Sequence, residues 1–127
     1  MGMDLALIPF GPFWRDGGLS GARVDIISST RLDTWREYEF YAQITEEMGE
    51  LGDKPVCDPQ PLPKNVILHV YEDEGLKELD EDPYGEKLTY VTAGELAKTK
   101  PKTPWNKSVI AFISTLPEDM PVILWWH

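Results

Sequence analysis

The stretch Pro121-Val122-Ile123-Leu124-Trp125-Trp126 is apolar at every position. A strand with one face in water alternates apolar and polar residues, whereas a strand covered on both faces is apolar throughout. We therefore expect residues 121–126 to form a buried strand. Such a strand can lie inside a core or at an interface between copies, so the sequence is also compatible with a homo-oligomer.

The segments upstream of this strand predict two helices and a further strand. Residues 109–116 (VIAFISTL) are predicted to form a buried helix that Pro117 ends. Thr92 followed by Glu95 matches a capping box, in which side chain and backbone hydrogen-bond reciprocally at a helix start. This pair predicts a short second helix, and residues 87–91 (KLTYV) before it are predicted to be a strand.

The N-terminal half is predicted to begin with two strands. Residues 3–10 and 22–28 have strand patterns, and the Gly-rich connection between them indicates an antiparallel hairpin. Residues 53–65 hold four prolines and are expected to be irregular or extended. The apolar run 66–71 fits a strand or a short helix, because periodicity cannot separate the two in so short a run. The segment 72–86 is predicted to be an exposed acidic loop.

A third helix is predicted from Trp35, where apolar residues begin to follow helical spacing as far as Met48. Asp33 or Thr34 together with Glu37 matches a capping box at its start. An alternating pattern also permits a strand here, but the glutamates that follow without a break favour the helix. These signals together predict one α+β domain over residues 1–127. We expect a small mixed or antiparallel sheet, an N-terminal hairpin, two to three helices and a buried C-terminal strand.

The charge and cysteine content limit the kinds of partner and compartment. A formal net charge of −10 argues against direct binding to nucleic acid or to an anionic membrane, since both need clustered basic residues. The acidity either keeps the protein in solution or presents a negative surface to a basic partner. Cys57 is the single cysteine, so no intramolecular disulfide is possible, and we expect a reducing, cytoplasmic setting.

The motifs of metal and catalytic sites are incomplete. Asp80-x-Asp82 opens like a calcium-binding loop, but Tyr84 and Val91 stand where that loop needs oxygen ligands. His69, His127 and Cys57 do not form a zinc-ligand spacing. No nucleophile elbow or phosphate-binding loop is present. We therefore expect no metal, no cofactor and no catalytic residues, and an enzyme with an unfamiliar site is the least favoured hypothesis.

Two groups of residues are candidates for binding. The acidic segment supplies carboxylates for a protein partner: Glu72, Asp73, Glu74, Asp80, Glu81 and Asp82. Arginine and aromatic side chains together can hold a nucleotide, through ion pairs to phosphate and stacking on the base. The candidates for such a ligand are Trp14, Arg15, Arg23, Arg31, Trp35, Arg36 and Tyr84. Trp14 is expected to be exposed on a loop, whereas Trp35, Trp125 and Trp126 are expected to be at least half buried.

Four features in order give the chain a resemblance to a known group. They are Arg36-x-Tyr38, Pro61-Leu62-Pro63, the stretch 88–96 with its Leu-Thr and Glu-Leu pairs, and Trp125-Trp126. In this order they resemble small uncharacterised proteins encoded by bacteriophages, over roughly residues 35–126. This chain has Asp82-Pro83-Tyr84 where that group often carries His and Ser.

The resemblance implies a phage accessory protein that acts in the host cytoplasm against host immunity. The favoured hypothesis is a non-catalytic inhibitor that binds a host defence protein through the acidic segment. The alternative is a protein that sequesters a small nucleotide signal through the arginine and aromatic set.

Overall fold

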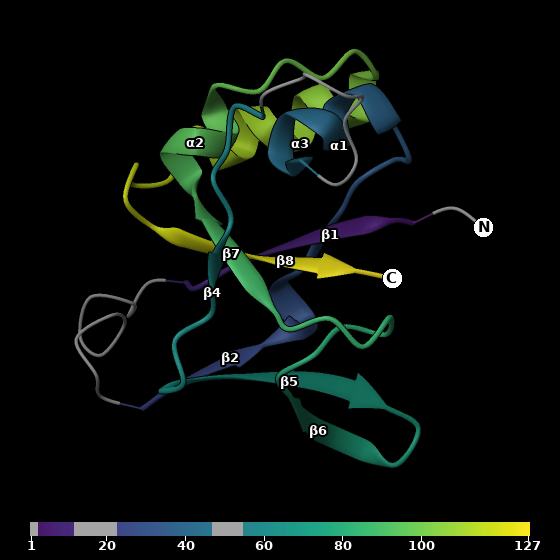
Figure 1. Cartoon of the computed structure of the whole chain (residues 1–127), viewed down its shortest axis with the longest axis vertical. Coiled ribbons are helices and arrows are strands. Elements are labelled where there is room, and N and C mark those ends of the chain that lie inside the picture. Colours follow the sequence, from purple (N-terminus) through teal and green to yellow (C-terminus); the bar gives the residue numbers. More distant parts are fainter. Residues whose placement is uncertain (1–2, 12–22, 47–54) are drawn as a thin grey trace.

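The chain folds as three layers, with helices on one face of a five-stranded sheet and a three-stranded sheet on the other (Figure 1). The computed structural model describes residues 3–11, 23–46 and 55–127. Within these residues there are three α-helices and eight strands. The five-stranded sheet is therefore the middle layer, and its central strands need apolar side chains on both faces.

The five-stranded sheet is antiparallel throughout and has the strand order β3-β1-β8-β7-β4. Its strands are β1 (Leu5–Pro9), β3 (Leu32–Asp33), β4 (Gln60–Pro61), β7 (Thr89–Thr92) and β8 (Pro121–Trp126). The three-stranded sheet consists of β2 (Val24–Ile27), β5 (Val66–Glu72) and β6 (Gly75–Leu79), in the order β2-β5-β6. In it, β2 pairs with β5 in parallel and β5 pairs with β6 in antiparallel.

The helices α1 (Tyr38–Ile44), α2 (Ala93–Ala97) and α3 (Pro104–Ile113) form the layer above the middle sheet, and a 3-10 turn, η2 (Ser28–Thr30), follows β2. The predicted capping box begins α2, since Thr92 and Glu95 make both reciprocal hydrogen bonds. At α3, the Thr103 side chain accepts a hydrogen bond from the Asn106 amide. Within the described ranges, no helix has the length and apolar character that crossing a membrane requires.

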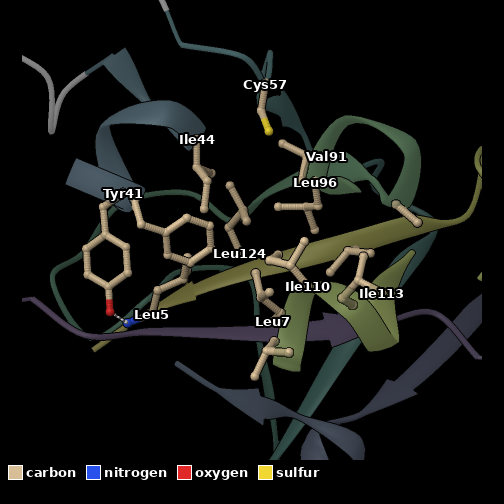
Figure 2. Packing of buried hydrophobic residues seen from close by; sticks show 14 of the residues in the cluster. Leu5, Leu7, Tyr41, Ile44, Cys57, Val91, Leu96, Ile110, Ile113 and Leu124 are labelled. Atoms are coloured by element: carbon tan, nitrogen blue, oxygen red, sulfur yellow. Dashed lines mark hydrogen bonds between the residues drawn. The ribbon is translucent and has the colours of Figure 1, made fainter. Parts of the chain in front are cut away.

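Strand β8 connects two hydrophobic clusters. Val122, Leu124 and Trp126 point into the cluster under the helices, while Ile123 and Trp125 point into the cluster between the sheets. Strand β1 is divided in the same way. Figure 2 shows the helix-side cluster, in which buried residues of α1, α2 and α3 pack on these strands. Because alternate residues serve opposite layers, one register error in β8 would disrupt both clusters.

The predicted fold class is confirmed, including the helices and the buried C-terminal strand. The predicted N-terminal hairpin is wrong, because β1 and β2 belong to different sheets. The reason lies in their patterning. Strand β1 is apolar on both faces and fits only the middle layer, whereas β2 buries one side chain, Ile26, and fits an outer sheet.

Two predicted segments differ from the observed elements. Helix α1 begins at Tyr38 rather than Trp35, because the backbone is still extended at Glu37, with φ −144° and ψ 97°. The Thr34 hydroxyl donates to the Leu5 carbonyl at 2.7 Å, and no side chain caps α1. The acidic segment is not a loop throughout, since it contains strand β6. The ambiguous run 66–71 lies in a strand, β5.

Truncating either face of β8 should destabilise the whole domain. We expect Leu124→Ala, on the helix side, and Ile123→Ala, on the sheet side, each to lower the free energy of unfolding by about 2–5 kcal/mol, because each leaves a cavity in a closed cluster. Chemical denaturation measures both changes. Phe112→Ala, at an exposed position of α3, is the control and should cost about 0.5 kcal/mol or less. A loss confined to Leu124→Ala would contradict the two-cluster arrangement.

Candidate functional site

The acidic segment begins as the tip of the β5–β6 hairpin. Glu72 pairs with Gly75, so Asp73 and Glu74 form the turn, and all three acidic side chains are exposed. Gly75 has φ +113°, a conformation that residues with a side chain rarely adopt. The sequence thus places a glycine where the chain reverses, and the reversal presents three consecutive carboxylates at one end of the small sheet.

The face of the small sheet that points away from the middle layer is covered by no described element (Figure 1). Along β5, alternate residues from Val66 face inward, which turns Tyr71 outward opposite Leu76 of β6. Tyr71 is 62% exposed, Leu76 is 48% exposed and Ile27 of β2 is 41% exposed. This outer face, defined by Ile27, Tyr71 and Leu76 with the charged residues between them, combines apolar contact area with carboxylates.

Four charged or titratable side chains occupy the middle of the outer face. Asp25 accepts hydrogen bonds from Arg23, and its Oδ1 lies 2.8 Å from His69 Nε2. The guanidinium of Arg23 also reaches Glu78 at 3.2 Å. The hydrogen bonds from Arg23 and from His69 hold the pKa of Asp25 below its ordinary value. The network includes side chains from all three strands, so it holds neighbouring strands together across the outer face.

The rest of the acidic segment, after β6, divides into internal and external carboxylates. Asp82 is buried, and its Oδ1 accepts hydrogen bonds from the backbone amides of Tyr84 at 2.9 Å and Glu86 at 3.1 Å. Asp80 and Glu81 both lie close to the Lys87 ammonium, at 3.1 and 3.2 Å. Among the predicted protein-binding residues, Asp82 is thus used to shape its own loop.

A groove lies beside the end of β6, where this strand separates from β5. Its volume is about 500 Å³, a size typical of ligand and side-chain pockets. The lining is mostly apolar, with Leu62, Leu79 and Leu88 among its residues. Its charged residues are two acids and two lysines: Glu78, Asp80, Lys64 and Lys87. The groove and the outer face share the end of β6, so they form one continuous candidate site.

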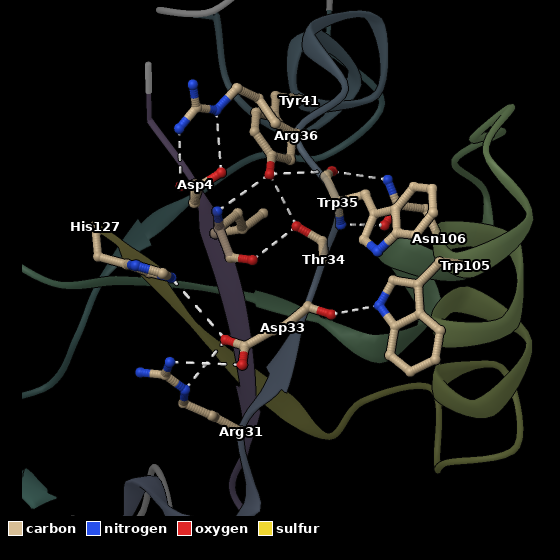
Figure 3. A network of polar contacts seen from close by, with 11 residues as sticks. Asp4, Arg31, Asp33, Thr34, Trp35, Arg36, Tyr41, Trp105, Asn106 and His127 are labelled. Carbon is tan, nitrogen blue, oxygen red and sulfur yellow. Dashed lines mark hydrogen bonds and ion pairs between the residues drawn. The ribbon is translucent and has the colours of Figure 1, made fainter. Parts of the chain in front are cut away.

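The structure divides the arginine and aromatic candidates between separate regions. Arg31 pairs with Asp33 at 3.1 Å and Arg36 with Asp4 at 2.9 Å, both near the edge strand β3 (Figure 3). Arg23 belongs to the small sheet instead, where it pairs with Asp25. An anion at any of these three guanidinium groups would compete with a carboxylate that is already bound. Trp14 and Arg15 lie outside the described residues.

The prediction that Trp35 is at least half buried is wrong, since this side chain is 60% exposed. Trp35 precedes α1 instead of opening it, and its backbone, rather than its ring, is held: the amide donates to Asn106 Oδ1 at 2.8 Å (Figure 3). Trp125 and Trp126 are buried, as predicted. Tyr84, another ligand candidate, lies in the loop after β6.

Hydrogen bonds to the Glu37 side chain connect the segment before α3 with the segment before α1. Its carboxylate accepts hydrogen bonds from the backbone amides of Lys102 at 2.9 Å and Thr103 at 3.1 Å, and from Asn106 Nδ2 at 3.1 Å. Burial by itself would raise the pKa of Glu37, but these three donors outweigh it and hold the pKa below the ordinary value of 4.5. This carboxylate is structural, and the sequence pattern had suggested a capping role instead.

Metal and nucleophile chemistry finds little support in the described residues. They contain no group of three or more His, Cys, Asp or Glu side chains that could hold a metal ion. Cys57 is buried, and burial, with a further contribution from Glu95, raises the pKa of its thiol to about 12. A thiol with so high a pKa is not a thiolate nucleophile at neutral pH.

Sequence reasoning missed the apolar part of the outer face. The signal was available: the hairpin turn ends in a glycine, and Tyr71 and Leu76 lie at matched distances on either side of the turn. The acidic composition of 72–86 concealed this strand pattern. Comparison of the chain with protein-family models, with curated proteins and with solved structures finds no match.

Replacing Glu37 should change how stability depends on pH. Folding lowers the pKa of Glu37. The ionised carboxylate therefore adds to the free energy of unfolding above the unfolded pKa, and this addition is lost as the pH falls through the folded pKa. We expect Glu37→Gln to cost about 1–2 kcal/mol at pH 7, since charge-assisted hydrogen bonds become weaker, and to cost progressively less below about pH 4.

Urea unfolding between pH 7 and pH 3 measures this difference. Glu39→Gln is the matched control, because Glu39 is exposed and forms a surface ion pair with Lys102. It should change the free energy of unfolding by about 0.5 kcal/mol or less. A Glu37→Gln cost that stays constant across the pH range would show that the carboxylate is not the source of the stabilisation.

Proposed function

We propose that this protein is a non-catalytic binding domain that recognises another protein through the outer face of its small sheet. The observation that carries the proposal is the position of Tyr71 and Leu76. They form an exposed apolar pair directly beside the acidic tip, on a sheet face that no described element covers. Aromatic and apolar anchors surrounded by charged residues are the usual composition of a protein-binding site.

The network beneath these anchors supports the same proposal. Arg23, Asp25 and His69 cross-link the strands of the sheet, so the anchors project from a surface that is already ordered. A preorganised surface loses less conformational entropy when it binds. The resemblance to phage accessory proteins suggests that the partner is a host defence protein, and this remains part of the proposal.

The nucleotide alternative receives less support from the same residues. Its three described arginines are each paired with an aspartate, and they belong to two separate regions of the fold. A phosphate group would have to displace those carboxylates without a common pocket to compensate for the loss. The hydroxyl of Thr92 does contact the Glu95 carboxylate, but this contact is part of the capping box that begins α2, so it does not favour an enzyme.

Selection from a displayed library of random peptides tests the proposed surface without a known partner. The immobilised full chain should enrich peptides that bind wild type at least about tenfold more tightly than the double variant Tyr71→Ser/Leu76→Ser, since two exposed anchors are lost. The variant should keep its fold, because both side chains are outside the hydrophobic clusters. Circular dichroism and thermal unfolding check this.

The matched control removes exposed apolar area from the helical layer. Trp35→Ser/Phe112→Ser changes two side chains of similar exposure, one just before α1 and one on α3. The helices lie on the opposite side of the middle sheet from the small sheet. Enriched peptides should bind this control as they bind wild type. Enriched peptides that depend on Trp35 and Phe112 but not on Tyr71 and Leu76 would contradict the proposal, and so would a selection that yields no binder.

A further inference from the structure

The free edge of β6 offers a second kind of contact beside the outer face. In the order β2-β5-β6, this strand has a partner on one side only within the described chain. Pairing alternates along an antiparallel ladder, so every second residue of β6 turns its backbone N–H and C=O away from β5. The residues that do so can be identified from the chain that follows β6.

The carbonyl of Asp80 accepts a hydrogen bond from the Leu88 amide at 3.0 Å, and so points away from β5. Leu76 and Glu78 stand four and two residues before Asp80, so they have the same position in the alternation. They therefore also direct their N–H and C=O groups to the free edge. The hairpin turn agrees with this assignment. In a two-residue turn the closing pair, here Glu72 and Gly75, exchanges both backbone hydrogen bonds, so the next residue, Leu76, turns its backbone groups outward. The open edge is short and covers Gly75 to Glu78.

We propose that an extended, basic segment of a partner protein adds to this edge as a further antiparallel or parallel strand. The inference rests on the proposed binding function and specifies its mode. Strand addition uses backbone hydrogen bonds for affinity and alternate side chains for specificity. Here the backbone groups of Leu76 and Glu78 supply the hydrogen bonds, and side chains of the added strand contact Leu76 on the outer face.

Charge selects the chemistry of the added strand. Around the open edge lie four carboxylates, Glu72, Asp73 and Glu74 at the tip and Glu78 along the strand. Two cations lie among them: Lys77 is 3.9 Å from Glu72, and Arg23 is 3.2 Å from Glu78. The carboxylates of Asp73 and Glu74 therefore leave the edge with an excess of negative charge. A strand with lysine or arginine at alternate positions would meet carboxylates on the outer face and at the tip, whereas an acidic strand would be repelled. The chain's net charge of −10 extends the same preference to longer range.

A second copy of this chain is a poor occupant of the edge. Two β6 strands that pair antiparallel about a twofold axis keep side chains of the same face opposite one another. Centring the pair on Lys77 opposes two lysines, and centring it on Glu78 opposes two glutamates. Centring it on Leu76 opposes Glu74 to Glu78. Like charges directly opposite destabilise a strand pair, so each register resists self-association.

Synthetic peptides test the proposal directly. The probe is a short peptide of alternating lysine and valine, and its controls are the glutamate–valine counterpart and the basic peptide N-methylated at two adjacent central amides. We expect the basic probe to bind the full chain in titration calorimetry and to slow amide exchange at Leu76 and Glu78. N-methylation should weaken binding by about tenfold or more, because a donor is lost on either edge of the peptide.

Two variants at one position separate backbone from charge. Glu78→Pro removes an outward-facing N–H and places a ring on the edge, which edge strands tolerate, whereas Glu78→Gln removes the charge alone. Binding of the basic probe should be abolished by Glu78→Pro and weakened only a few-fold, about threefold, by Glu78→Gln. If Glu78→Pro fails to fold, the N-methylated peptide still decides the question with wild-type protein.

The outcomes distinguish this inference from the proposed function. Basic-probe binding that depends on Tyr71 and Leu76 but ignores N-methylation and Glu78→Pro would overturn strand addition and leave the binding surface intact. Equal binding of the basic and acidic peptides would overturn the basic partner. No binding of the basic probe, with library peptides that still require Tyr71 and Leu76, would overturn the inference alone.

Discussion

The two-sided burial of strands β1 and β8 is the constraint on which the other layers depend. Their side chains alternate between a cluster under the helices and a cluster between the sheets, so neither layer can be removed without exposing half of each strand. The helices need only one apolar face, and so does the small sheet. Because the small sheet is an outermost layer, no element of residues 3–11, 23–46 or 55–127 covers its second face, and that face carries the candidate site.

Carboxylates in this protein have two separate roles that composition alone cannot distinguish. Glu37 and Asp82 turn inward and accept backbone amide hydrogens, so they organise connecting segments. The carboxylates of the hairpin tip turn outward and contribute to the surface potential. A net charge of −10 therefore overstates the charge available to a partner, and among the outward carboxylates those of the hairpin tip occupy three consecutive positions.

The sequence was sufficient for the features that depend on local patterns. The apolar run at 121–126 predicted a strand covered on both sides, and Thr92 with Glu95 predicted the start of α2. It was insufficient where the outcome depended on distant partners. Thr34 looks like a helix cap until Leu5 and Tyr41 are close enough to take its hydroxyl. The acidic residues likewise hid β6, because its pairing with β5, rather than its own composition, makes it a strand.

The central pairing of β1 with β8 joins segments from opposite ends of the sequence. Contacts between such distant residues require a large loop to close before they contribute any stability, and this slows folding. On the ribosome, β1 emerges first and remains without its main neighbour until residues 121–126 have been synthesised. Until then β1 has only the short strand β3 as a neighbour, and its apolar side chains stay exposed. The nascent chain should therefore depend more than a helical protein of equal length on chaperones that shield it.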